Sequence, residues 1–405
     1  MMRSFRRALA LTAASLLAVV THGHALGAQA VPQVVPSAAV NIPDMLHVQG
    51  RDADIALITA GDGDEIWEMF GHAAIWIHDN RTARDTVFNW GVFDMRAPFF
   101  ILHFLQGLNV YRMGGDPLSY VMLYYRHFNR TLTAQHLDLT DAQKDSIISI
   151  IRTNALPENV NYRYDYFVDN CSTRPRDILD QVLGGQLRVG SDSLPGTTYR
   201  YHALRLMQSN GPLVAGVDIG LGEPSDRPIT KWQEMFLPEK LHDWVATRQI
   251  RDSSGATRPL VKAEQVLYLE HGRPAEPLVP PRLGLWLTLI GVVLGVIFLV
   301  VGVRGRGMAG PVLFSIWSIV AGLLGIALTL LWTVTDHRFA HYNENLLIFN
   351  PLWLILAVML PRYLRSGKAP NATRKLTLTL TGLTVLALLA HLVFLSRQSN
   401  LAVIG

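Results

Sequence analysis

Long apolar segments in the last third of this 405-residue chain restrict its fold more than any other feature. An apolar stretch of about 20 residues is long enough to cross a bilayer as a helix. The whole chain is 49% hydrophobic, which favours a soluble part combined with membrane spans. We therefore predict an α-helical membrane domain of four spans over residues 283–405. The spans are expected at 283–303, 311–334, 351–360 with its flanks, and 376–395.

Basic residues cluster in two of the three loops that join these spans. Arg304 and Arg306 lie in the first loop, and five lysines and arginines lie between 362 and 375. Cytoplasmic loops are enriched in Lys and Arg, so both basic loops are expected in the cytoplasm. The preceding part of the chain, the loop 335–350 and the carboxy-terminus then face outward. We expect a multi-pass protein of the bacterial inner membrane with its larger domain in the periplasm.

The amino-terminus has the pattern of an export signal. Three arginines precede an apolar run over 8–20, and Ala28-Gln29-Ala30 offers a small-x-small cleavage site. The run is short for a membrane span, so cleavage after Ala30 is favoured over an uncleaved anchor. Residues 1–30 are therefore predicted to be a signal peptide, and the Val/Pro-rich residues 31–50 a linker. Export agrees with the orientation that the basic loops predict.

The region 51–282 is predicted to be a folded extracytoplasmic domain of the α+β class. Short apolar runs are separated by Gly, Pro and Asn, which is typical of strands and short helices joined by turns. Thr140 and Gln143 form a capping box at the start of one helix. Strands are expected at 55–60, 72–77, 86–93, 108–113, 120–125, 131–139 and 260–269, and short helices at 98–106, 199–208 and 229–236.

Two stretches allow two interpretations each. The helix 98–106 is very apolar, so it is either a buried core helix or a surface that dips into the bilayer or holds an acyl chain. The loop 335–350 is rich in polar side chains. It is either an ordinary solvated turn or a segment that approaches the domain at the lipid surface.

Cys171 is the only cysteine, so an internal disulfide cannot form. It follows the alternating tyrosines of 162–166 and precedes a helix, for which Asn170, Ser172 and Thr173 are good N-cap residues. A helix N-terminus favours the thiolate, and Arg174 and Arg176 add positive charge. The polar neighbourhood favours a nucleophile over a buried, inert cysteine.

A thiol nucleophile needs a base and a group that orients the base. His72 begins an apolar strand behind Gly71, and Asn89 lies on the next strand. If these strands are neighbours, both side chains share one face, with His72 as base and Asn89 as its acceptor. The chain order His, Asn, Cys predicts a circularly permuted papain-like domain.

Four further residues near Cys171 are candidates for holding the oxyanion or the substrate. Tyr164 and Tyr166 supply hydroxyl groups, and Asn170 and Arg174 flank the thiol directly. The backbone N–H of Cys171 is the expected principal oxyanion donor, because it lies at a helix start.

Several long motifs together resemble the Lnb family, the intramolecular lipoprotein transacylases. They are EMFGHAAIWI (68–77), VFNWGVFDM (87–95), PFFILHFLQG (98–107), YDYFVDNCSTRPRDIL (164–179), FLPEKL (236–241) and TDHRFAHYNENLLIFNP (335–351). The resemblance implies a cysteine–histidine pair, carried here by Cys171 and His72. It also implies acyl transfer from a diacylglyceryl-cysteine to the N-terminal amine, with membrane lipid and diacylated lipoprotein N-termini as partners. More distantly, the chain is similar to permuted lecithin:retinol-acyltransferase-like thiol enzymes.

Other functions are open or disfavoured. An exported cysteine hydrolase of the same fold remains an alternative, as does a non-catalytic envelope binding module. The net charge is only +4 and no basic run is interleaved with aromatic residues, so nucleic-acid binding is not expected. His337 and His341 lack an apparent third ligand, so neither a metal nor another cofactor is expected. The oligomeric state is left open.

Overall fold

The computed structural model describes residues 47–95, 97–252, 254–304, 309–366, 370–392 and 397–399. The predicted signal peptide (1–30), most of the predicted linker and the tips of the two basic loops lie outside the described residues. These residues form an α+β domain and the helical region that follows it.

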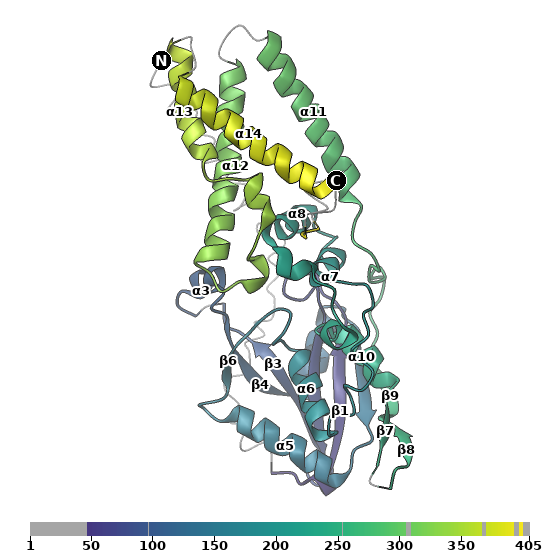
Figure 1. Ribbon diagram of the computed structural model, residues 1–405. Coiled ribbons are helices and arrows are strands. Elements are labelled where there is room, and N and C mark those ends of the chain that lie inside the picture. Colours follow the sequence, from purple (N-terminus) through teal and green to yellow (C-terminus); the bar gives the residue numbers. More distant parts are fainter. Residues whose placement is uncertain are drawn as a thin grey trace. The chain divides into compact units, whose positions relative to one another are not determined.

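An antiparallel seven-stranded sheet forms the framework of the α+β domain (Figure 1). The strand order is β6-β4-β3-β2-β1-β5-β9, so the first strand lies near the middle of the sheet. The strands are β1 (Ala53–Ala60), β2 (His72–Asp79), β3 (Arg84–Val92), β4 (Val110–Pro117), β5 (Leu132–Leu137), β6 (Asn161–Arg163) and β9 (Val261–Tyr268). A separate hairpin pairs β7 (Gln249–Arg251) with β8 (Thr257–Pro259).

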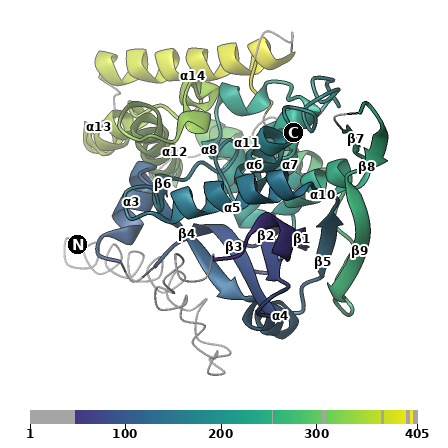
Figure 2. The same cartoon turned by 90° about the horizontal axis from the view of Figure 1, so that it is seen from below.

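Helices cover both faces of the sheet (Figure 2). The helices α5 (Asp141–Ala155), α6 (Thr173–Val182) and α10 (Pro238–Ala246) pack on one face, and α4 (Leu118–His127) packs on the other. Side chains of β1 alternate between the two resulting cores, because successive strand residues point to opposite faces. Ile55 and Leu57 belong to the first core, and Ala56 and Ile58 to the second.

The remaining helices of the domain are short. They are α3 (Phe100–Gln106), α7 (Tyr199–Leu206), α8 (Gly211–Gly220), α9 (Lys231–Glu234), and the 3-10 turns η1 (Gly50–Asp52) and η2 (Glu223–Asp226). The capping box predicted for α5 is present: Thr140 accepts from the Gln143 N–H, and Gln143 accepts from the Thr140 N–H.

One strand prediction for this domain is wrong, and one of the two interpretations of residues 98–106 is excluded. The segment 120–125 is part of helix α4 and not a strand. Val121 and Tyr125 lie one helical turn apart, and both are buried against the sheet. The residue types of this run are also common in strands, and here the packing of the helix against the sheet overrides that preference. The helix at 98–106 is not a buried core helix, because none of the residues of α3 is buried.

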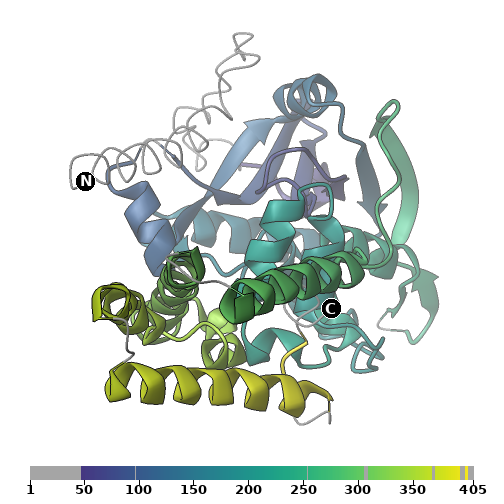
Figure 3. The same ribbon diagram turned by 90° about the horizontal axis from the view of Figure 1, so that it is seen from above.

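The described part of the carboxy-terminal region contains four α-helices: α11 (Leu283–Arg304), α12 (Ala309–Thr333), α13 (Trp353–Ser366) and α14 (Asn371–Leu392) (Figures 1 and 3). Among the described residues, two segments are long and apolar enough to cross a membrane, Gly310–Thr333 and Asn371–His391. Helix α13 has 14 residues and is about 21 Å long, which is less than the ~30 Å of a bilayer core. The structure therefore supports two of the four predicted spans by length and composition.

The loop between α12 and α13 packs on the α+β domain and is not an ordinary solvated turn. It contains two 3-10 turns, η3 (Arg338–Ala340) and η4 (Glu344–Leu347). Asn343 is 2% exposed and donates hydrogen bonds to the carbonyls of Ile219, Gly220 and Leu221 at the end of α8. The ring of Phe339 packs 4.7 Å from that of Phe167.

Candidate active site

Cys171 directly precedes Ser172, the N-cap residue of helix α6, which agrees with the predicted place just before a helix start, and it is partly accessible. The side chain of Asn170 holds this junction. Its Oδ1 accepts from the N–H groups of Ser172 and Thr173, both at 2.9 Å. Its Nδ2 donates to the carbonyls of Tyr166 and Phe236, also both at 2.9 Å. Asn170 is therefore a buried residue that fixes the turn before α6, and the polar atoms of its side chain are already used.

His72 and Asn89 lie side by side on one face of the sheet. Strands β2 and β3 are neighbours, and Ala74 is the residue opposite Asn89, so His72 is its diagonal neighbour. The His72 Nε2 lies 3.0 Å from the Asn89 Oδ1. The Asn89 Nδ2 donates to the carbonyl of Val87, which orients the amide with its oxygen toward the imidazole. On this basis we assign the proton of neutral His72 to Nε2, which leaves Nδ1 to accept a proton.

The thiol of Cys171 interacts with His72, the backbone N–H of Ala73 and the Tyr164 hydroxyl. Burial raises the pKa of the thiol. The charge of His72 and the hydrogen bonds from these three groups outweigh burial, so the pKa of Cys171 lies below its ordinary value. Burial lowers the pKa of His72, but the Cys171 charge and the hydrogen bonds to Cys171 and Asn89 raise it overall. Each group favours the charged form of the other, which is the condition for a thiolate–imidazolium pair.

The two arginines after Cys171 do not have the predicted effect, because neighbouring carboxylates neutralise them. Arg174 donates from Nε and Nη2 to Asp169, and its guanidinium lies 4.0 Å from the Tyr162 ring centre. Arg176 is buried and pairs with Asp177 at 2.7 Å. Arg174 therefore supports the structure of the segment before Cys171. The lowered pKa of the thiol comes mainly from His72, with hydrogen bonds from the Ala73 N–H and the Tyr164 hydroxyl.

The two candidate tyrosines have different surroundings. Tyr164 donates to the sulfur of Cys171, and burial raises the pKa of Tyr164 well above its usual value, so its hydroxyl stays protonated. The Tyr166 hydroxyl instead accepts from Asn109 at 2.9 Å. The Tyr166 ring stacks on His337 of the loop 335–350, with ring centres 6.2 Å apart. Only Tyr164 of the two has its hydroxyl at the thiol.

Gly91 is a site residue that the sequence analysis does not single out. Its φ of +93° belongs to the left-handed region, and the strand pairing shifts between Trp90 and Val92. A Cβ at this position would lie 3.1 Å from the Tyr164 ring and 3.7 Å from the Cys171 Cβ. Glycine thus allows β3 to approach the nucleophile closely. In the sequence, the sign of this role is an isolated glycine within a strand pattern, which indicates a bulge or a close approach of the backbone.

The loop 335–350 contributes a second unexpected group, Arg338. Its Nε lies 2.7 Å from Oδ2 of Asp165. The other oxygen of Asp165 accepts from the N–H groups of Phe167 and Val168. Asp165 and Asp169 also exchange two backbone hydrogen bonds. The turn 165–169 directly precedes the Asn170–Cys171 segment. Arg338, which lies in the loop 335–350 and not in the α+β domain, stabilises this turn through Asp165.

No group of three or more His, Cys, Asp or Glu side chains that could hold a metal is found in the described part of the chain. The ring nitrogens of the two loop histidines bond to backbone carbonyls, His337 to Phe104 and His341 to Thr335. The groups assembled at Cys171 are thus a thiol, an imidazole, an amide and a phenol. These can perform nucleophilic attack at a carbonyl and proton transfer without an added group.

Comparison with protein families gives two matches. Residues 46–205 match the Lnb N-terminal periplasmic domain, and residues 276–404 match the Lnb transmembrane domain. Searches of curated proteins and of solved structures gave no significant match. The first match contains the whole Cys171 site, and the second contains the helices α11–α14 and the loop that carries Arg338. These domains indicate a membrane-associated, lipoprotein-processing protein with a periplasmic domain. The chain belongs to the Lnb family.

Proposed function

We propose that the chain is a thiol acyltransferase that moves one acyl chain of a diacylated lipoprotein onto the lipoprotein's own N-terminal amine. The observation that carries this proposal is the contact of Cys171 with His72. The Nε2 of His72 in turn lies 3.0 Å from the Oδ1 of Asn89. This arrangement provides a nucleophile, its base and a group that orients the base. The family assignment supplies the lipoprotein and the membrane.

The reaction has two acyl-transfer steps. The Cys171 sulfur attacks the sn-2 ester carbonyl of the diacylglyceryl group while the thiol proton passes to Nδ1 of His72. The tetrahedral intermediate collapses, the ester C–O bond breaks, and His72 returns the proton to the leaving glycerol oxygen. The α-amine then attacks the thioester carbonyl and loses a proton to His72. The C–S bond breaks while His72 passes this proton to the leaving sulfur, which regenerates the thiol and yields an N-acyl, lysoglyceryl product.

Two donors are proposed for the developing oxyanion. The backbone N–H of Cys171 lies at the start of α6, and no hydrogen-bond acceptor for it is found among the residues that the structure describes. The Tyr164 hydroxyl is a second donor, since its raised pKa keeps it neutral. Donors fixed in this way stabilise charge that appears only in the intermediate. Asn170 and Arg174 are proposed to position the segment and not to touch the substrate.

A membrane location suits this chemistry, because donor ester and acceptor amine belong to one molecule at the bilayer surface. Holding reacting groups together can lower a barrier by about 7–11 kcal/mol. We further propose four spans in the inner membrane, a periplasmic catalytic domain and a circularly permuted papain-like fold, in which the order His72, Asn89, Cys171 reverses that of papain. Hydrolysis, with water in place of the amine, is the second candidate function. The partly accessible thiol is the observation that keeps it open.

The test is an assay of the purified full-length protein with a synthetic diacylated lipopeptide. We expect a product of unchanged total mass in which fragmentation places one acyl chain on the N-terminal amine. Cys171→Ala should abolish the product, while His78→Ala, on the same strand as His72 but bonded to Asp85, should retain it. Release of free fatty acid in place of the transfer would identify a hydrolase. Product formation by Cys171→Ala would exclude the proposed nucleophile.

A further inference from the structure

An exposed apolar surface surrounds helix α3. We call it the α3 surface and define it by Phe99, Ile101, Leu102, Phe104, Leu105 and Leu108. Phe99 and Ile101 are each 72% exposed, and the others range from 38% to 58%. The backbone of Phe99 is left-handed, with φ of +60°, which is uncommon for a residue other than glycine. No burial of the Phe99 side chain within the protein offsets this backbone conformation. A contiguous exposed apolar surface on a protein usually marks a contact with a partner or a membrane.

Helix α3 is fixed beside the end of a membrane-spanning segment. Helix α12 ends at Thr333, and three residues later the N–H of Asp336 donates to the carbonyl of Gln106 at 2.8 Å. The Nε2 of His337 donates to the carbonyl of Phe104 at 2.9 Å. Gly107, with φ of +73°, permits this approach, since a Cβ there would lie 2.9 Å from the Asp336 backbone.

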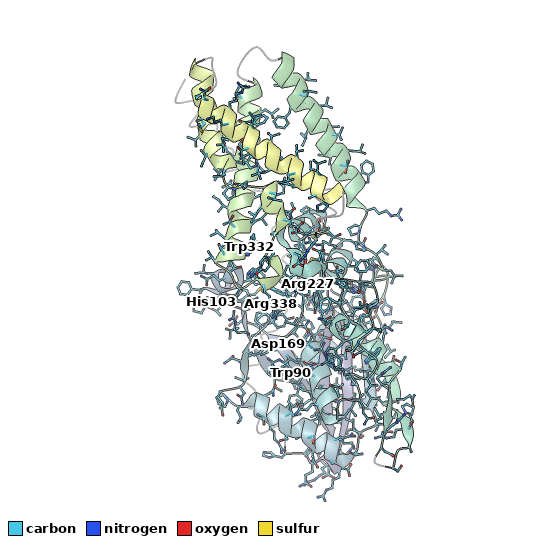
Figure 4. All side chains as sticks on the ribbon, in the orientation of Figure 1. Trp90, His103, Asp169, Arg227, Trp332 and Arg338 are labelled. Atoms are coloured by element: carbon cyan, nitrogen blue, oxygen red, sulfur yellow. The ribbon has the colours of Figure 1, made fainter. Side chains whose placement is uncertain are left out.

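Aromatic side chains mark the same end of α12 as a membrane–water interface. The rings of Trp332 and Tyr342 lie 5.4 Å apart, and both are exposed at the surface. Tryptophan and tyrosine are enriched at this level of membrane proteins. Figure 4 shows His103 of α3 and Arg338 just beyond Trp332, on the side of the α+β domain. The α3 surface thus lies beside the end of α12, where Leu330 and Val334 also expose apolar side chains.

The α3 surface also connects to the thiol through aromatic rings. Phe104 lies 6.4 Å from Tyr166, Tyr166 lies 6.0 Å from Tyr164, and Tyr164 contacts Cys171. These ring contacts link the α3 surface to the nucleophile.

We propose that α3 inserts into the bilayer beside the end of α12, with the α3 surface in contact with lipid acyl chains. Helix α3 then anchors the catalytic domain at the depth where the ester groups of its lipid substrate lie. The position of the α3 surface beside the end of α12 selects lipid over a soluble protein partner. Insertion of α3 depends on the membrane association of the family and not on the acyl-transfer reaction. An experiment can therefore contradict the insertion proposal without contradicting the proposed function, and the reverse.

The test measures lipid contact directly in the full-length chain. Replacing Cys171 by Ser leaves no cysteine, so a cysteine introduced at Ile101 or Leu105 is the only site for a nitroxide spin label. These residues are four apart on α3 and share one side of the helix. The matched control is a label at Ser149, an exposed position on α5, which packs on the sheet. The labelled proteins are reconstituted in phospholipid nanodiscs.

Molecular oxygen concentrates in lipid, and a nickel chelate concentrates in water. We expect the oxygen-to-nickel accessibility ratio at Ile101 and Leu105 to be several-fold above that at Ser149. A ratio equal to that of Ser149 would overturn the proposal, because α3 would then face water. Low accessibility to both reagents would also overturn it, because a protein partner or a second copy would then cover α3. None of these outcomes depends on catalytic activity.

Discussion

At the residue scale, the properties of Cys171 follow from one partner more than from its sequence neighbours. The sequence predicts the pairing of His72 with Asn89, because strand alternation and adjacency place both on one face. It does not predict that Arg174 and Arg176 are neutralised by Asp169 and Asp177. The direction in which each arginine side chain points determines which carboxylate it pairs with. The sequence alone does not determine that direction.

The pH dependence of Cys171 alkylation tests this pairing. The wild-type thiol should react with a midpoint below that of an ordinary thiol, because its pKa is lowered. In His72→Ala the burial of the thiol remains and the stabilising charge is lost, so the pKa rises. Where the thiol pKa lies above the assay pH, each further unit of increase lowers the thiolate fraction, and with it the alkylation rate, by about tenfold.

His78→Ala is the matched control, because His78 lies on the same strand but bonds to Asp85. It should leave the profile unchanged. If His72→Ala and wild type gave the same midpoint, His72 would not control the thiol. If wild-type Cys171 reacted only after denaturation, the nucleophile itself would be excluded.

At the element scale, strands and caps are predictable where the local pattern and the packing agree. The strands at β1, β2 and β3 and the capping box of α5 are confirmed. Helix α4 is not predicted, and the sequence leaves α3 either buried or exposed, because residue type alone does not reveal whether an apolar run meets the sheet or the outside. The role of the loop 335–350 is likewise set by contacts with segments more than 100 residues earlier in the chain.

Arg338 should position the turn that leads to Cys171. Arg338→Ala removes the ion pair with Asp165, which also accepts from two N–H groups of this turn. Arg338 is 56% exposed at its side chain, so the loss in stability should be at most about 1 kcal/mol. The rate of Cys171 alkylation and the rate of acyl transfer should nevertheless fall several-fold, and Arg338→Lys should restore part of both.

Arg227→Ala provides the comparison, because it breaks a different surface ion pair, with Glu223 at 2.9 Å. Melting temperatures and alkylation rates are measured for both variants. Arg227→Ala should match wild type in both measurements. Wild-type alkylation and transfer rates in Arg338→Ala would contradict a positioning role for this loop.

At the scale of the whole molecule, the loop 335–350 contacts the α+β domain at segments that precede and follow Cys171 in the sequence. Before Cys171, Arg163 and Asp165 pair with Asp336 and Arg338. After Cys171, the end of α8 accepts a hydrogen bond from Asn343. The sequence predicts two domains and their order, but not these contacts, because their partners are remote in the chain. The outward orientation inferred from the basic loops remains a prediction.

The acyl-enzyme on Cys171 is the intermediate on which the proposed function depends. Its accumulation requires that the second step be blocked, so the substrate is a diacylated lipopeptide whose α-amine has been acetylated. Full-length wild-type protein is incubated with this peptide, and its intact mass and Cys171 peptide are measured. We predict one acyl group on Cys171, removable by neutral hydroxylamine, slower formation in His72→Ala and none in Cys171→Ala. An unmodified Cys171 in wild type, together with transfer to a free-amine peptide by Cys171→Ala, would contradict the thioester mechanism.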